Sequence, residues 1–540
     1  MQRRLVPILT ILSAMIVVAG TIFLRAQPQA PVPVGDEWGI WFHGAASVSA
    51  WERFVTSARR CAADPDSPIP LQVDDSQAFL EQSTEIPQVT LGVPGMDRKF
   101  HMRWYKLRAG RSESEWLDEL LQLSPPPRVI VTPAGSDRAS FLANNLRQRL
   151  DDGRLSPEQA PLLVLLGATA NVVSSSVTVD RQTDLTQLPS DMGRKLSDIY
   201  PDRTIRFCFT NQQMARAVSD FVFRHPELRP HLPPDPWHLL LSGAVLPALP
   251  YRMASIEWQD DPYTVDLCQQ FRDYLQRDLQ HSFPQRLIRA DSPTAIDRFS
   301  ISHSVGGFYR INPSERNQVS LMLRSGIFES GGRTLLVIPG VANPARRLLR
   351  AITAANPELA SQMVAVTGDS ISMNTVYRDG GYAWNVRDIS MPFVFFAHHN
   401  PVEWVATPPP SHPEADNQDI LTPPTGTEDV LRNSEMITVL MRSMVDSESN
   451  DFHADWTALA SRLKSQHLDR FQANGDRRLD QPKYIVVVDP RQRSGLLQPR
   501  ERLQLIQVFV STADRNHPWR AVRLDPSFPP STPSGEESPE

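Results

Sequence analysis

Cysteine is scarce in this chain, which carries three in 540 residues. Cys61, Cys208 and Cys268 lie far apart, and no Cys-x-x-Cys pair occurs. Structural zinc sites and disulfide frameworks need closely spaced or numerous cysteines, so the sequence encodes neither. We expect the three thiols to lie in hydrophobic cores, while one long-range disulfide stays open as an alternative.

Runs of basic residues are missing as well. The chain has 55 Lys and Arg against 61 Asp and Glu, a formal net charge of −6. A surface that binds nucleic acid needs clustered basic side chains against the phosphates, often interleaved with aromatic residues. Since the sequence has neither pattern, we expect no nucleic-acid partner.

The motifs of common enzyme classes are also absent. The sequence has no Gly-x-Ser-x-Gly, no Walker phosphate loop, no His-Glu-x-x-His and no Gly-x-Gly-x-x-Gly after a strand. His398 and His399 are adjacent, but neighbouring side chains of an extended segment point to opposite sides. They are therefore better explained as buried, hydrogen-bonded histidines than as ligands of one metal. We expect no enzymatic activity, no metal and no cofactor.

The amino terminus has the features of a membrane anchor. Arg3 and Arg4 precede an uncharged run at residues 5–24, and about 20 apolar residues suffice to cross a bilayer as a helix. Positive charge before the run predicts a single-pass protein of the cell membrane whose bulk is extracytoplasmic, in the periplasm. A retained anchor and tether over residues 1–35 is favoured, and a cleaved signal at residues 26–30 stays open.

Between the termini, short apolar segments alternate with segments of helical period. Residues 129–132 read as a strand before a helix at 139–150, and residues 334–338 read as a strand before a helix at 345–355. This rhythm predicts an α/β fold with parallel sheets covered by helices on both faces. The chain is long enough for two or three domains, and a tail at 525–540 rich in Pro, Ser and Glu is expected to be disordered.

One stretch stands out as a site candidate. Residues 253–258 read as a buried strand, an acidic turn follows, and a helical period resumes at Val265. In an open parallel sheet such a turn lies at the carboxyl end of a strand, where ligands meet the amides of a helix start. The alternative is that Asp261 only caps the helix, with Pro262 in its first position.

Four stretches, taken in order, resemble a known family. They are residues 206–222, 253–277, 335–370 and 471–488, and together they are similar to the type I periplasmic binding proteins, in the subgroup of ABC-transporter solute-binding proteins for branched-chain amino acids. The resemblance covers roughly residues 38–510. Gln472 departs from it, because the family often has Asp there, and the loops at 231–249 and 405–426 are additional.

The resemblance implies two doubly wound parallel-sheet lobes, joined by three hinge crossings, that close on a ligand between them. The motifs place the crossings near Phe209, near residues 368–370 and near residues 472–476. The implied lobe I comprises residues 36–208 and 371–472. The implied lobe II comprises residues 209–370 and 473–515.

The resemblance also implies a site for the carboxylate of an amino acid. The family holds this group with a Ser after the third strand and with an Ala and a Thr after the fourth, which match Ser136, Ala168 and Thr169 here. Hydroxyls and amides at helix starts can bind a carboxylate without a cation. The alternative is that both hydroxyls cap their helices.

The ammonium group of an amino acid lacks its expected partner. The family's acidic residue for this group corresponds to Ala345, whose methyl group cannot pair with a cation. Candidate substitutes are Asp260, Asp261, Tyr263 and Asp369.

Two functions follow as hypotheses. The first is a membrane-anchored solute-binding protein that closes on a small ligand, amino-acid-like or a carboxylate, and works with an ABC permease or as a sensor. The second is a bilobed interaction or scaffold protein of the cell envelope that has lost small-ligand binding.

Overall fold

The computed structural model describes the following residues: 38–42, 48–79, 86–96, 99–107, 110–123, 126–132, 135–173, 194–231, 252–259, 261–278, 295–301, 313–324, 332–340, 342–372, 389–401, 427–445, 463, 470–472, 474–478, 480–490, 506–514 and 517–522. The anchor and tether expected at residues 1–35 and the tail at 525–540 lie outside them. Within these ranges, no helix combines the length and the apolar character that a bilayer crossing requires.

A sheet of seven described strands forms the centre of lobe I, in the order β2-β3-β4-β1-β5-β6-β9. The strands from β4 to β9 run parallel, and β2 and β3 pair antiparallel at one edge. Their bounds are β1 (Trp38–Phe42), β2 (Gln72–Asp74), β3 (Gln88–Gly92), β4 (Lys99–Trp104), β5 (Val129–Val131), β6 (Leu162–Leu165) and β9 (Thr204–Arg206). A separate antiparallel pair joins β7 (Val172–Val173) to β8 (Arg194–Lys195).

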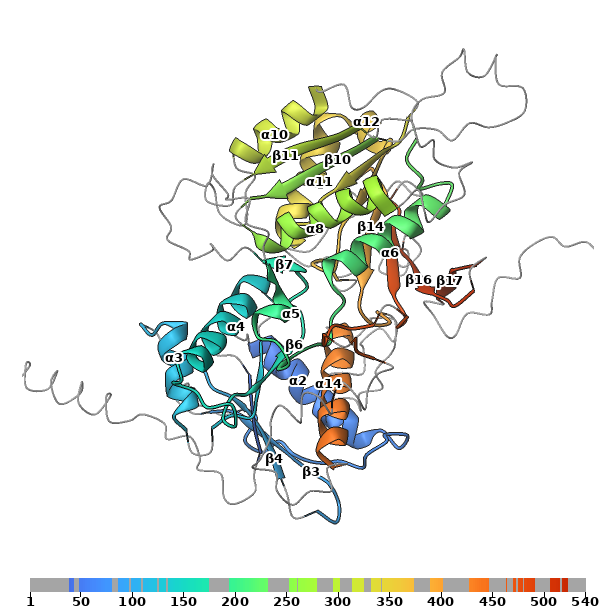
Figure 1. The fold of residues 1–540 in the computed structure, drawn as a ribbon. Coiled ribbons are helices and arrows are strands. Elements are labelled where there is room, and N and C mark those ends of the chain that lie inside the picture. The colour runs from blue at the N-terminus through green and yellow to red at the C-terminus, as the bar shows by residue number, and fades with distance from the viewer. Residues whose placement is uncertain are drawn as a thin grey trace, which may run out of the picture.

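Helices cover both faces of this sheet, because alternate strand residues point to opposite sides. Val129 and Val131 join a hydrophobic cluster with α2 and α14, whereas Ile130 joins one with α3, α4 and α5. The bounds of these helices are α2 (Val48–Ala63), α3 (Glu113–Leu121), α4 (Ser136–Asp151), α5 (Leu196–Ile199) and α14 (Thr427–Val445). Figure 1 shows α14 beside α2, although the two are far apart in sequence.

A sheet of eight described strands forms the centre of lobe II, in the order β11-β10-β12-β13-β14-β15-β16-β17. The strands from β11 to β14 run parallel, and the remaining three pair antiparallel. Their bounds are β10 (Arg252–Trp258), β11 (Ala295–Ile301), β12 (Thr334–Val337), β13 (Met363–Val366), β14 (Phe393–Ala397), β15 (Tyr484–Val488), β16 (Ile506–Ser511) and β17 (Trp519–Val522).

Lobe II is also covered on both faces. Leu335 and Val337 pack on the side of α6 and α8, whereas Leu336 packs on the side of α10, α11 and α12. The bounds of these helices are α6 (Asn211–Arg224), α8 (Pro262–Asp273) with a π-helical continuation η2 (Tyr274–Asp278), α10 (Pro313–Arg324), α11 (Ala342–Ala355) and α12 (Pro357–Ser361). The expectation of an α/β fold with two doubly wound sheets is confirmed by this arrangement.

The chain passes between the lobes at three places in the described residues. It leaves lobe I between β9 and α6, returns between β14 and α14, and leaves again between α14 and β15. The expected middle crossing near residues 368–370 is wrong, since β14 pairs with β13 and β15 in lobe II. The strand β14 (Phe393–Ala397) therefore belongs to lobe II, whereas the resemblance implies lobe I for residues 371–472. An apolar strand can join either sheet, and only its pairing decides which.

The cysteines fulfil the expectation of buried thiols. Cys61, Cys208 and Cys268 are free and buried. Cys61 belongs to α2 and lies in the hydrophobic cluster that α2 forms with α14 and the first sheet. Cys268 lies in the hydrophobic cluster between α8 and the second sheet. The long-range disulfide left open above is absent from these three described residues.

Candidate functional site

The carboxyl ends of the parallel strands of the two lobes face each other. In each sheet the strand order reverses between the first and third parallel strands, which are β1 and β5 in lobe I and β10 and β12 in lobe II. Helix α4 starts shortly after β5, helix α8 starts shortly after β10, and these two helices contact one another. In doubly wound folds, ligands bind outside the carboxyl ends of the strands at such a reversal. The structure therefore brings two potential binding edges together.

The residues of the lobe I edge are Ser136, Ala168 and Thr169. Ser136 is the first residue of α4, and its hydroxyl accepts a hydrogen bond from the Ala170 amide at 3.1 Å. Gly135, which has no capping side chain, is the N-cap residue. Ala168 is fully buried, and its carbonyl accepts from the Cys208 thiol at 3.6 Å.

Thr169 combines complete burial with an unused hydroxyl. Its side chain is 0% exposed, and its Oγ1 has no hydrogen-bond partner among the described residues. Its carbonyl accepts from the Asn211 amide at 2.8 Å, which links it to the first residue of α6. Neither Ser136 nor Thr169 caps a helix, so the capping alternative is wrong for both. A buried polar group without a partner costs free energy, which a hydrogen-bonding ligand could recover.

The residues of the lobe II edge are Tyr263 and Asp369. The Tyr263 hydroxyl donates to Asp369 Oδ1 at 3.2 Å and accepts from the Ser370 amide at 3.3 Å. Burial, together with the Asp369 carboxylate, raises the pKa of Tyr263 well above its usual value, so the phenol keeps its proton. Gly368 permits this approach, because a Cβ at that position would lie 2.7 Å from the Tyr263 hydroxyl oxygen. The two lobe II candidates are thus adjacent, but they bind each other.

Asp261, another of the acidic candidates, is engaged in capping α8. Asp261 is the N-cap of α8 and accepts from the Tyr263 amide at 3.0 Å, with Pro262 at the first helical position, as the alternative reading of this turn predicted. Asp260 lies outside the described residues. Ala345 is fully buried in the core between α11 and the second sheet, where an ionised carboxylate would have no place.

His398 connects the lobe II edge to the first crossing. Its Nε2 donates to Asp369 Oδ2 at 2.7 Å, and its Nδ1 accepts from the Phe209 amide at 3.0 Å, so the ring is neutral in this arrangement. Burial lowers the pKa of His398 despite the neighbouring carboxylate. Burial by itself raises the pKa of Asp369, but His398, Arg432 and a backbone hydrogen bond together outweigh it and keep that pKa below its usual value. The expectation of a buried, hydrogen-bonded histidine is confirmed for His398.

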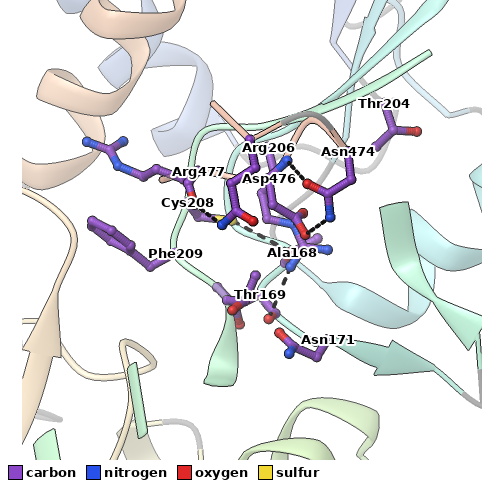
Figure 2. A network of polar contacts seen from close by, with 12 residues as sticks. Ala168, Thr169, Asn171, Thr204, Arg206, Cys208, Phe209, Asn474, Asp476 and Arg477 are labelled. Carbon is purple, nitrogen blue, oxygen red and sulfur yellow. Dashed lines mark hydrogen bonds and ion pairs between the residues drawn. The ribbon is translucent and has the colours of Figure 1, made fainter. Parts of the chain in front are cut away.

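The third crossing is held by Arg477. Its guanidinium donates to the Phe207 carbonyl at 2.6 Å, pairs with Glu435 of α14 at 2.7 Å, and lies 4.8 Å from the ring centroid of Phe209. Figure 2 shows Arg477 and Phe209 at the left of the view and Thr169 lower and nearer its centre. The contacts of His398 and Arg477 therefore join all three crossings in one buried polar cluster.

Direct hydrogen bonds also join the lobes beside Thr169. Asp266 of α8 accepts from the amides of Asn171 at 2.8 Å and Val172 at 3.4 Å, both in lobe I. The Asn211 side chain donates to the same carboxylate at 2.8 Å. Sequence reasoning missed Asp266, because a carboxylate in the second turn of an amphipathic helix is usually solvent-exposed. It also missed the roles of His398 and Arg477, since their partners are remote in sequence.

Among the described residues, no group of three or more His, Cys, Asp and Glu side chains is placed to hold a metal ion. Within this part of the chain, the site offers hydroxyls, amides and paired carboxylates, which suit hydrogen bonding to an organic solute.

No protein-family model and no curated protein sequence matches this chain. Its structure is similar to an ABC transporter substrate-binding protein from Desulfitobacterium hafniense, at 12% identity and a TM-score of 0.45, with 90% of this chain and 99% of that one covered. It is also similar to a leucine-binding protein from Thermotoga maritima, at 12% identity and a TM-score of 0.46, with 84% and 95% covered. A third similar structure is an ABC transporter solute-binding protein from R. palustris in complex with 4-hydroxybenzoate, at 7% identity and a TM-score of 0.43, with 84% and 92% covered.

These proteins are of the kind that the sequence motifs resemble. Identities and TM-scores this low carry no information on what the present chain binds, which has to be inferred from its own residues.

Proposed function

We propose that this chain is a solute-binding protein that holds a small organic ligand between its lobes. The observation that carries the proposal is the contact between α4 and α8. These helices start beside the points where the strand order reverses in each sheet, so the contact brings the two potential binding edges close together. A ligand that touches both edges would stabilise the closed arrangement by the contacts that the open arrangement lacks. No covalent chemistry is part of this function.

The proposed ligand contacts are Ser136, Ala168 and Thr169 from lobe I and Tyr263 and Asp369 from lobe II. Thr169 is the strongest of them, because its buried hydroxyl has no partner among the described residues. Ser136 and Tyr263 already make hydrogen bonds within the protein, so they would contribute by exchanging partners. The proposed ligand class is a small amino-acid-like or carboxylate compound.

Delivery of the ligand to an ABC permease, or its use as a sensory signal, is part of the proposal. So is attachment to the cell membrane through residues 1–35 with the remaining chain on the periplasmic side, which rests on the sequence pattern alone. Membrane fractionation of the full chain and of a chain starting at residue 36 tests the attachment. Equal recovery of both from the soluble fraction would refute it.

A second candidate is a scaffold protein of the cell envelope that keeps the fold and binds no small ligand. The observation that favours it is that polar groups of both edges are used internally, as in the Tyr263–Asp369 pair and in the bond between Asp266 and Asn171. Ala345 points the same way, because it removes the family's partner for an ammonium group.

A melting-temperature screen of the full chain against amino acids, benzoates and small carboxylates separates the two candidates. The solute-binding proposal predicts a rise with at least one compound, since a ligand at 100 times its Kd stabilises the folded state by about 2.7 kcal/mol. No shift across such a panel, with a protein captured from the envelope, would favour the scaffold.

Thr169→Val then tests the site itself. Without ligand, the variant should unfold within about 1 kcal/mol of the parent or be more stable, because an unpaired buried hydroxyl is removed. Ligand affinity should fall by about 10- to 150-fold, the equivalent of about 1.5 to 3 kcal/mol for a lost hydrogen bond to a charged group. Ser219→Ala is the control, since its hydroxyl is likewise buried without a partner among the described residues but lies within α6. Unchanged affinity in Thr169→Val would remove this residue from the site.

A further inference from the structure

The carboxylate of Asp266 is bound in the way that a ligand carboxylate would be. The residue is 6% exposed, and its two oxygens accept four hydrogen bonds. Oδ2 accepts from the Asn171 amide and the Asn211 side chain, both at 2.8 Å. Oδ1 accepts from the Val172 amide at 3.4 Å and from the Gln270 side chain at 3.2 Å. Every one of these donors is an uncharged amide.

Two of these donors belong to lobe I, whereas Asp266 belongs to lobe II. Asn171 and Val172 follow Thr169 after one intervening residue, at the edge of lobe I where the proposed ligand binds. Asp266 comes from the other lobe, on the helix that contacts α4. Burial raises the pKa of Asp266 while its amide donors oppose that rise, so the hydrogen bonds offset part of the lost hydration of the charge.

We propose that Asp266 is a tethered carboxylate that closes the lobes in place of a solute. Its bonds to Asn171 and Val172 hold lobe II against the edge of lobe I with no small molecule needed. A solute carboxylate that sought the same two amides would have to displace Asp266 first. The contact is an autoinhibitory latch on the proposed function, and it still joins the two lobes if the chain binds no solute.

Amide hydrogen exchange of the full chain, followed by mass spectrometry, tests the latch. In Asp266→Ala the segment containing residues 168–173 should exchange at least about tenfold faster than in the parent, because its amides lose their acceptor and the lobes separate there. Asp273→Asn is the matched control: it removes a charge from the same helix, and that carboxylate accepts from Gln269 of α8 itself. This control should exchange like the parent in the 168–173 segment.

Chemical rescue distinguishes a latch from a merely structural hydrogen bond. Sodium acetate should slow the exchange of residues 168–173 in Asp266→Ala, whereas sodium chloride at the same ionic strength should not, and the parent should respond to neither. Asp266→Asn covers the case in which the alanine variant fails to fold, since it keeps the side-chain volume but removes the charge and replaces one of the two acceptor oxygens by a donor. The proposal is overturned if the variants exchange at the parent's rate, or if acetate and chloride act alike. Either result leaves the melting-temperature screen for solutes unaffected, so the two proposals fail separately.

Discussion

Glu435 offers a sharp test of the polar cluster at the crossings. Its side chain is 10% exposed and pairs with Arg477 at 2.7 Å and Arg470 at 2.8 Å, and the His399 ring lies 3.4 Å away. Because Glu435 belongs to α14 and Arg477 belongs to the third crossing, the pair links a helix of lobe I to the segment that leads into lobe II. The change Glu435→Gln removes the negative charge and keeps the size and shape of the side chain.

The magnitude follows from the burial of each partner. The side chain of Arg477 is 6% exposed, so its cation would be left in a nearly dry environment with no charged partner among the described residues. Breaking a buried ion pair in this way costs about 3 to 5 kcal/mol. The side chain of Arg470 is 36% exposed, so its share is below about 1 kcal/mol. Since glutamine still accepts a hydrogen bond, we expect a loss of about 3 kcal/mol in the free energy of unfolding.

Urea unfolding followed by circular dichroism measures this loss. The control is Asp480→Asn, which breaks the pair of Asp480 with Arg478 at 2.7 Å in the same crossing, where the side chains are 59% and 41% exposed. That change should cost less than about 1 kcal/mol. The reasoning fails if the two variants lose similar amounts, or if Glu435→Gln stays within 1 kcal/mol of the parent.

Two further predictions concern protonation and packing. Burial lowers the pKa of His399 well below its usual value. Below about pH 6.5 the unfolded chain therefore takes up a proton at this histidine, whereas the folded chain does not. The free energy of unfolding is unaffected by this group above that pH and falls as the pH falls below it. In His399→Gln the loss of unfolding free energy between pH 7.5 and 5.5 should be smaller than in the parent, by up to about 1.4 kcal/mol. The comparison has to be between parent and variant, because burial raises the pKa of Glu428 to about 8 and that group titrates in the opposite sense. Gly340→Ala should cost about 1 to 3 kcal/mol in urea unfolding, since its Cβ would lie 2.4 Å from the buried ring of Trp258, while Gly92→Ala meets nothing within 4 Å and serves as the control.

Two results would contradict these expectations. Parallel pH profiles of the parent and His399→Gln would show that the folded chain protonates this ring as readily as the unfolded one. Equal stabilities of Gly340→Ala and Gly92→Ala would show that the Trp258 ring can move aside.

Local patterns determined much of the fold from the sequence alone. The alternation of apolar strands with amphipathic helices specifies wound α/β sheets, because both faces of a parallel sheet must be covered. The same alternation places Ser136 and Thr169 at one edge, since parallel strands end on the same side. Asp261 and Pro262 mark the start of α8 by capping chemistry that acts within one turn of helix.

Tertiary structure decided which sheet β14 joins and which partners the buried polar side chains have, because these partners are remote in sequence. The apolar strand β14 suits either sheet, and only its pairing with β13 and β15 assigns it to lobe II. Asp266 has the spacing of an ordinary helix residue, and only the docking of the lobes surrounds it with the amides of Asn171 and Val172. His398 likewise gains its tautomer from Phe209 and Asp369. Periodicity and capping are encoded within a few residues, whereas the desolvation and pairing of a polar group are set by whichever distant segment packs against it.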